Sequence, residues 1–337
     1  MSIFNSLLEP QQYLLIPAMP TPNGRLHLGH MAGPFLKMDM LARTFRRSGH
    51  LADVMSASDV YESYVLRKAH QTGLSVEAVC EQYHALIKED MEALMLDCTA
   101  YFNPLTRAYR EKTDFYYRDT LEALVESGTA YQRAEKVLYS PEADKYIVGT
   151  WLQGDCPHCG SGAGSYLCEA CGMQFNPEDV VNPSSTTGET DLEETEVDTL
   201  FLKVKEENLL MERIRQMGIR EEMVDVVKQY MHHYDGEVRL TNPGNWGTQW
   251  TDEQLRGSNY HVVFPYSGLF SLSRICGEIL ADKYSLDKNP FDQGSSVTTI
   301  ASFGIDSTIP WFVGVLGANL AADRFKPFDY FLTNYFY

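Results

Sequence analysis

Two histidines three residues apart, His27 and His30, occur in the segment P-N-G-R-L-H-L-G-H at 22–30. If this segment enters a helix, both imidazoles face the same side of its first turn. There they can donate hydrogen bonds to phosphate oxygens, together with the free backbone N–H groups and the positive end of the helix dipole. Gly29 has no side chain and would let a flat base lie on the helix turn. A metal pair is the alternative, but no acidic third ligand is near in the sequence. The pattern favours a nucleotide phosphate site.

Four cysteines form the pattern C-x2-C-x8-C-x2-C, and a glycine follows each pair. They are Cys156, Cys159, Cys168 and Cys171. Such spacing is typical of two knuckles that hold Zn²⁺ in a tetrahedron of thiolates. Four thiolates leave no coordination position for a substrate water, so the zinc is expected to be structural and to act at a distance from the chemistry. Disulfides and chance are the alternatives. The isolated Cys80, Cys98 and Cys276 are interpreted as ordinary buried residues.

The elements that must position the histidines form a βαβ unit. Residues 13–19 (YLLIPAM) are typical of a buried parallel strand that ends in a Pro- and Gly-containing loop. Apolar residues then recur at helical spacing from Leu28 to Arg47, and Gly49 marks the end of that helix. Residues 52–57 predict a second strand. We therefore predict an α/β fold of the Rossmann type (HUP-like), with a doubly wound parallel sheet and a ligand crevice at the carboxyl ends of its strands.

The rest of the chain suggests a split domain with an insertion. Helices are predicted near 75–97 and 105–127, the latter ending at Gly128, and again over 206–233. Two segments, 258–282 and 297–323, resemble a strand entering a helix and are expected to add strands to the same sheet. Residues 130–205 hold the cysteines and an acidic run, as a zinc-bearing connective insertion would. The predicted division is 1–120 and 241–337 for the two halves of the Rossmann domain and 121–240 for the insertion.

Composition limits the possible partners. The 337 residues carry a formal net charge of -18, which argues mildly against extensive contact with tRNA or DNA. The basic run R-T-F-R-R at 43–47 is interpreted as a solvated helix face. No run of about 18 apolar residues is present, so no membrane span is expected. The N-terminus lacks the features of a secretion signal, so a cytoplasmic location is expected. The sequence does not indicate the oligomeric state.

The motif P-x-x-N-G-x-L-H-L-G-H-x-A-G at 20–33 resembles the HIGH signature of class I aminoacyl-tRNA synthetases. The cysteine pattern, with the segment LYSPEADKYIVGTWLQGD before it, resembles the connective insertion of methionyl-tRNA synthetases. The resemblance runs in order from about residue 13 to 337. It implies an adenylate-forming ligase that joins an amino acid to AMP from ATP, with Mg²⁺ and a structural zinc. In that family the next step transfers the aminoacyl group to tRNA in protein biosynthesis.

The resemblance also implies roles for single residues. His27 and His30 would contact the phosphates as the transition state develops. Asp59, expected at the carboxyl end of the second strand, would pair with the substrate ammonium; a helix cap is the alternative. Asp306, in a stretch similar to the family's F-G-K-D, would approach the ATP ribose, with a cap again as the alternative. Further candidates are Asn23, Gly29 and Gly304 for the nucleotide and Ala18, Met19, Thr21 and Val263 for the amino acid.

Three departures from the family pattern affect the substrate side. The family's L-P-Y appears as Met19-Pro20-Thr21, its V-W-F-D-A-P as residues 262–267, and the lysine of its G-K-D as Ile305. Changes from aromatic to small side chains alter which substrate fits a pocket. We therefore expect the adenylating residues to be retained and the amino acid to differ from methionine.

The acceptor of the activated amino acid is left open. The first hypothesis is a synthetase that passes it to tRNA, and the second is a paralogue that passes it to a small-molecule amine in a biosynthetic pathway. The third is a non-catalytic binding module. The family's mobile K-M-S-K-S loop is expected shortly after 334–337, where the sequence stops, so a fragment and a natural lack of that loop are both possible.

Overall fold

The centre of the molecule is a five-stranded parallel sheet with the order β15-β14-β1-β2-β3. The computed structural model describes residues 10–204, 207–250, 261–263 and 265–334. The strands of this sheet are β1 (Gln12–Pro17), β2 (Leu51–Ala57), β3 (Ala100–Phe102), β14 (Thr298–Gly304) and β15 (Tyr330–Asn334). The strand order reverses between β1 and β14, as in a Rossmann fold. The predicted α/β class with a doubly wound sheet is confirmed.

The predicted βαβ unit is also confirmed, with one irregularity in its helix. After β1 the helical segment consists of α1 (Leu28–His30), a π-helical turn (Met31–Phe35) that contains Pro34, and α2 (Leu36–Arg47). Gly49 follows the helix at φ +87°, a conformation that suits glycine and ends the helix where predicted. A π-turn at this place is typical of helices that bear functional sites.

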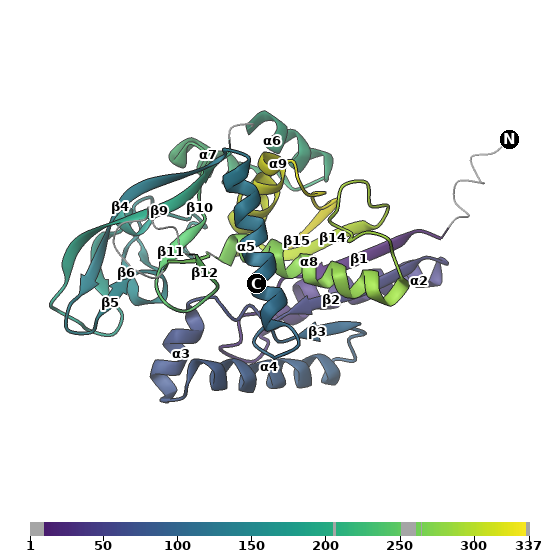
Figure 1. Cartoon of the computed structure of the whole chain (residues 1–337), viewed down its shortest axis with the longest axis horizontal. Helices are drawn as coiled ribbons and strands as arrows, with labels where there is room; N and C mark the ends of the chain where they lie inside the picture. The colour runs from purple at the N-terminus through teal and green to yellow at the C-terminus, as the bar shows by residue number, and fades with distance from the viewer. Residues whose placement is uncertain (1–9, 205–206, 251–260, 264, 335–337) are drawn as a thin grey trace.

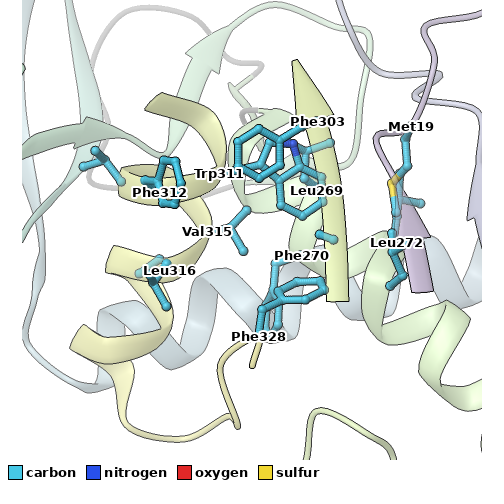
Figure 2. Packing of buried hydrophobic residues seen from close by; sticks show 14 of the residues in the cluster. Met19, Leu269, Phe270, Leu272, Phe303, Trp311, Phe312, Val315, Leu316 and Phe328 are labelled. Carbon is cyan, nitrogen blue, oxygen red and sulfur yellow. The ribbon is translucent and has the colours of Figure 1, made fainter. Parts of the chain in front are cut away.

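Both faces of the sheet are covered. Successive residues of β1 point to opposite sides, so they pack into different hydrophobic clusters. Leu15 packs with Met38 and Ala42 of α2 on one face. Leu14 and Ile16 belong to the large cluster on the other face. That cluster includes residues of α8 (Pro265–Tyr284) and of the π-helix Pro310–Gly317 that follows β14. Figure 2 shows the Trp311 ring lying against Phe303, with centroids 5.3 Å apart and the rings parallel to within 2°.

The remaining helices differ from the prediction in their bounds. They are α3 (Tyr64–Thr72), α4 (Val76–Ala93), α5 (Arg110–Glu126), α6 (Glu207–Gln216), α7 (Glu221–Tyr234) and α9 (Ala318–Ala322). The sequence did not predict α3. The stretch 206–233 is two helices because Gly218, at φ +71°, interrupts it. α5 starts five residues later than expected, since the Asn103 side chain accepts a hydrogen bond from the Leu105 N–H and holds a turn there.

The insertion forms two antiparallel sheets at one side of the Rossmann sheet (Figure 1). The larger has the order β10-β9-β4-β5, with strands Glu237–Arg239, Glu193–Lys203, Ala130–Ser140 and Lys145–Ile147. The smaller has the order β7-β6-β8, with strands Gly162–Gly164, Leu152–Asp155 and Val181–Ser185. A buried ion pair, Arg239 with Glu135, ties β10 to β4. Thr199 of β9 also donates to the Glu135 carboxylate, over 2.8 Å, and so adds β9 to this polar contact.

The expectation that 258–282 adds a strand to the main sheet is wrong. Its strand, β13 (His261–Val263), pairs antiparallel with β11 (Thr241–Pro243) and β12 (Gln249–Trp250) in a separate three-stranded sheet. The apolar pattern predicts that a strand exists, but it does not specify the partner of so short a strand. Residues 258–260 lie outside the described part of the chain. The helix predicted after this strand is present as α8, and it packs against the main sheet.

The basic run at 43–47 is largely neutralised by carboxylates. Arg43 donates to Asp39 over 2.8 Å, and Arg46 forms an ion pair with Asp97. This agrees with a solvated helix face and not with a polyanion site. Among the described residues, no helix combines the length and the apolar character needed to cross a bilayer.

Candidate nucleotide and amino-acid site

A cavity of about 540 Å³ opens at the carboxyl ends of β1 and β14, where the strand order reverses. This is the position at which open α/β sheets bind their ligands. Most of the residues singled out from the sequence line it. They are Ala18, Met19, Thr21, Asn23, His27, Gly29, His30, Asp59, Gly304 and Asp306. The fold thus gathers residues from three separate segments of the chain around one space.

The two histidine rings lie together at the start of the helical segment, with centroids 3.9 Å apart. His27 caps α1, since its Nδ1 accepts a hydrogen bond of 3.1 Å from the Gly29 N–H. An imidazole that accepts at Nδ1 can carry a proton only on Nε2. His30 Nδ1 is buried and has no hydrogen-bond partner among the described residues. Burial, and then the neighbouring His27, lower the pKa of His30 to about 4, so His30 is neutral at pH 7.

Asp59 follows β2 and is only 6% exposed. Its backbone N–H donates to the Pro20 carbonyl over 3.0 Å, which joins it to the loop after β1. Its Oδ1 is buried without a hydrogen-bond partner among the residues that the structure describes, and Asp59 does not cap α3, which begins after Ser63. Burial, and then the nearby Glu62, raise the pKa of the Asp59 carboxyl well above its usual value. An unpaired buried carboxylate at a cavity wall is suited to a cationic ligand.

Asp306 lies in a short 3-10 turn, Ile305–Ser307, directly after β14. Solvent reaches its side chain from the cavity, but the surrounding protein raises the pKa of its carboxyl to about 6. The carboxyl is therefore largely ionised at pH 7 and can accept hydrogen bonds. Gly304 at the end of the strand keeps this part of the cavity wall free of a side chain.

The structure does not bring Val263 to this cavity. Val263 lines a second, adjacent cavity instead, because β13 belongs to the separate antiparallel sheet. Leu269 and Trp311, which the sequence did not single out, also line the first cavity. Val262, also compared with the family, lines the second cavity as well. Phe264 and the side chains of 265–267 lie outside the described residues.

The four cysteines converge as predicted. Their sulfur atoms all lie within 4.8 Å of one another, and no other group of this kind occurs in the described part of the chain. Cys156 and Cys171 are 3.8 Å apart and Cys159 and Cys168 are 3.6 Å apart, measured between sulfur atoms. A tetrahedron with Zn–S bonds of about 2.3 Å has S···S edges of about 3.8 Å, so the geometry fits zinc. Gly160 and Gly172 follow the pairs at φ +73° and +74°, as the tight turns require.

The knuckle is not remote from the nucleotide site, contrary to the expectation from the sequence. Leu167 and Glu169 line the same cavity as His27 and Asp306. A neighbouring cavity of about 650 Å³ has Cys168 among its lining residues and shares those four residues with the first. The knuckle lies here because the small insertion sheet folds back toward the Rossmann domain, a long-range contact that cysteine spacing does not reveal.

Several further polar residues of the cavity were missed from the sequence. Glu62 lies one turn after Asp59, Tyr166 comes from the insertion, and Glu169 stands between two of the cysteines. Arg25 also lines the cavity, but it is paired with Asp90 at 2.7 Å. The only signal for Glu62 in the sequence is its spacing from Asp59, and surface glutamates at such spacing are too common to be informative.

Comparison with known proteins gives a consistent family. A family model described as "tRNA synthetases class I (M)" matches residues 13–262. The methionine-tRNA ligase of Cutibacterium acnes is 29% identical over 250 residues, which make up 71% of this chain and 40% of the relative. That of Methanococcus aeolicus is 24% identical over 302 residues, 88% of this chain and 44% of the relative. The chain thus spans less than half the length of these curated relatives.

Solved structures agree on the fold. The crystal structure of Mycobacterium tuberculosis methionyl-tRNA synthetase bound by methionyl-adenylate superimposes with a TM-score of 0.65 and 14% sequence identity. The superposition covers 97% of this chain and 57% of that chain. At this identity the similarity concerns the fold alone.

Proposed function

Because the chain belongs to the class I tRNA synthetases (M), we propose that it activates an amino acid by forming an aminoacyl-adenylate and pyrophosphate from ATP. The observation that carries the proposal is the cavity at the reversal of strand order, which combines the imidazoles of His27 and His30 with the buried carboxyl of Asp59, whose Oδ1 has no hydrogen-bond partner in the described part of the chain. A carboxylate of this kind suits an α-ammonium, and N–H donors at a helix start suit phosphates.

The proposed mechanism needs no covalent step on the protein. The substrate carboxylate attacks the α-phosphorus of ATP, and the bond to the β-phosphate oxygen breaks as pyrophosphate leaves. His27 and His30 donate hydrogen bonds to phosphate oxygens as negative charge accumulates in the transition state. Asp59 holds the ammonium group of the amino acid so that its carboxylate faces the phosphate. Asp306 accepts hydrogen bonds from the ribose, with Asn23, Gly29 and Gly304 completing the nucleotide side.

Two metals are part of this proposal. Mg²⁺ bound with ATP neutralises part of its phosphate charge. Zn²⁺ held by the four cysteines would fix the knuckle that forms one wall of the cavity and would take no part in the chemistry, because four thiolates fill its coordination shell. The division into Rossmann halves at 1–120 and 241–337 with an insertion at 121–240 is likewise proposed.

We expect the substitution Cys168→Ser to abolish stoichiometric zinc binding and to loosen the knuckle, since a closed four-thiolate site loses one ligand. Zinc content by elemental analysis and hydrogen exchange over residues 152–185 measure the two effects. Cys98→Ser is the matched control, because Cys98 lies on the far side of the sheet near Val54, and it should keep full zinc content. Unchanged zinc in the Cys168 variant would contradict the site.

We propose two candidate acceptors for the activated amino acid. The names of the relatives make tRNA the first candidate. A small-molecule amine is the second, and one observation favours it: the adjacent cavity has aromatic and acidic walls, which are unsuited to a polyanion. A non-catalytic binding module would have no need of paired imidazoles at a phosphate site.

ATP–pyrophosphate exchange over a panel of the twenty amino acids, with and without tRNA, tests the proposal. We expect exchange with one or a few amino acids. Replacement of the family's aromatic residues near Thr21 favours a substrate other than methionine. Exchange with methionine and charging of tRNA would instead identify an ordinary methionyl enzyme, and no exchange with any amino acid would leave only the binding module.

A further inference from the structure

A second cavity, of about 590 Å³, lies next to the first and shares Glu62 and Tyr166 with it. Its other walls come from residues 61–66, from the β4–β5 hairpin, from Trp151, from the segment Asn242–Trp246 and from β13. Of the residues that the sequence singled out, Val263 alone lines it. The proposed adenylation reaction therefore assigns no function to this second cavity.

Six aromatic side chains line this cavity, and several of them are held in place by neighbouring groups. The aromatic lining residues are Tyr61, Tyr139, Tyr146, Trp151, Tyr166 and Trp246. Trp246 donates its indole N–H to the Val60 carbonyl over 2.8 Å and meets the Tyr61 ring edge to face. Tyr139 donates its hydroxyl to Asp144 over 2.5 Å. Rings fixed around a space present faces that attract a cation.

The charged groups of this lining leave a negative excess. They are Glu62, Asp144 and Lys145. Lys145 is already paired with Glu189 at 2.7 Å and stands 4.3 Å from the centre of the Trp151 ring. Glu62 accepts hydrogen bonds only from Ser63, from its N–H at 2.9 Å and its hydroxyl at 3.2 Å. No cation in the described part of the chain forms an ion pair with Glu62.

We propose that the second cavity binds a small primary amine, which takes the aminoacyl group from the adenylate, and that Glu62 accepts a proton from it. The proposal rests on the adenylation proposed above and assigns the acceptor side of the same reaction. A carboxylate that borders both cavities is within reach of a ligand in the second while the adenylate fills the first. Burial raises the pKa of the Glu62 carboxyl, which makes it a stronger base than an exposed glutamate.

The transfer balances without any further reactant. The ammonium group enters between the aromatic faces and gives one proton to the Glu62 carboxylate. The resulting neutral nitrogen attacks the acyl carbon of the adenylate, a carbon–nitrogen bond forms, and the bond from that carbon to the phosphate oxygen breaks. AMP leaves with the electron pair of the broken bond and takes the second nitrogen proton. The product is an amide.

A nucleic acid is a poorer occupant of this cavity. The 3′ end of a tRNA would bring phosphates next to Glu62 and Asp144, and the one cation in the lining is already engaged with Glu189. Polynucleotide sites carry a surplus of free Lys and Arg along the backbone path. The lining therefore favours a small cationic ligand.

The test measures the two steps separately on the 337-residue chain. ATP–pyrophosphate exchange reports the first step, and amide formation with the probes putrescine, L-lysine and ethanolamine, detected by mass spectrometry, reports the second. We expect at least one of these amines to give amide with saturation.

Glu62→Gln should lower amide formation per unit of exchange at least tenfold, and Glu62→Asp should restore part of it. Trp246→Leu should raise the KM for the amine by roughly 2- to 25-fold, as loss of a cation–π contact implies. Glu122→Gln, on the exposed face of α5, is the matched control.

The outcomes distinguish this inference from the function on which it rests. Exchange without amide from any of the three amines would overturn it, as would charging of tRNA together with no amide. Equal ratios of amide to exchange in the Glu62→Gln and wild-type proteins would remove Glu62 from the step. Failure of exchange in the wild-type protein would instead refute the adenylation itself.

Discussion

Substitution His30→Ala is expected to lower the rate of ATP–pyrophosphate exchange by about 100- to 1,000-fold, the usual effect of removing one donor from a preorganised anion site. His30 is mostly enclosed, is neutral at pH 7 because its pKa lies at about 4, and has an unpartnered Nδ1. Such a group gains a partner only when ligand is present, so its contribution is larger in the transition state than in the free protein.

His50→Ala is the matched control for this measurement, because His50 lies at the opposite end of β2 from the site, where it accepts from the Gln11 N–H. The control should exchange close to the wild-type rate. Thermal melts of both variants check that the fold is kept. Undiminished exchange in the His30 variant would exclude this residue from the mechanism.

Asp59→Asn is expected to change activity and stability in opposite directions. Loss of the carboxylate removes the partner of the substrate ammonium, which costs about 2 kcal/mol or more and corresponds to a rise in the KM for the amino acid of roughly 30-fold or more. The KM for ATP should change much less, because Asp59 is proposed to contact only the amino acid. Exchange kinetics with each substrate varied in turn measure the two constants.

The stability effect follows from the raised pKa of Asp59. In the folded protein this carboxyl keeps its proton to a higher pH than in the unfolded chain. The resulting stabilisation is present below the unfolded pKa and is lost as pH rises through the folded value. As the pH rises, the buried carboxyl therefore stabilises the fold less, and the neutral asparagine, which does not titrate, should raise the free energy of unfolding at pH 7 by about 1–3 kcal/mol.

Urea denaturation at pH 7 measures this gain, with Asp287→Asn as the control on the exposed surface. The difference between the Asp59 variant and the wild-type protein should shrink as the pH is lowered toward 4. A variant that binds the amino acid normally, or one that is less stable at pH 7, would contradict the role of Asp59 as an unpaired ligand group.

Local patterns in the sequence were sufficient for the parts of the site that depend on short-range geometry. The strand at 13–19 and the helix at 28–47 follow from apolar periodicity, and the spacing of His27 and His30 brings their rings to one face. The cysteine cluster follows in the same way, because two knuckles with correct spacing need only a few residues each to position their sulfur atoms.

The parts that were missed depend on contacts between distant segments. The partner of a three-residue strand such as β13 is chosen by packing, and its assignment to a separate sheet moved Val263 to the second cavity. Glu62 has no distinguishing pattern, since its importance arises from the aromatic residues that the insertion brings next to it. The same long-range folding carries the knuckle to the wall of the nucleotide cavity.

Because the knuckle lies at the wall of the cavity, the zinc content of a preparation is expected to affect every rate measured on this protein. Although the zinc would do no chemistry, a chain that has lost it would lack an ordered Glu169 and Leu167 beside His27 and Asp306. Removal of the zinc by a chelator would then weaken nucleotide binding. A substitution of His27 or His30 is expected to have the same effect. Rates of variants can be compared only between preparations of equal zinc occupancy.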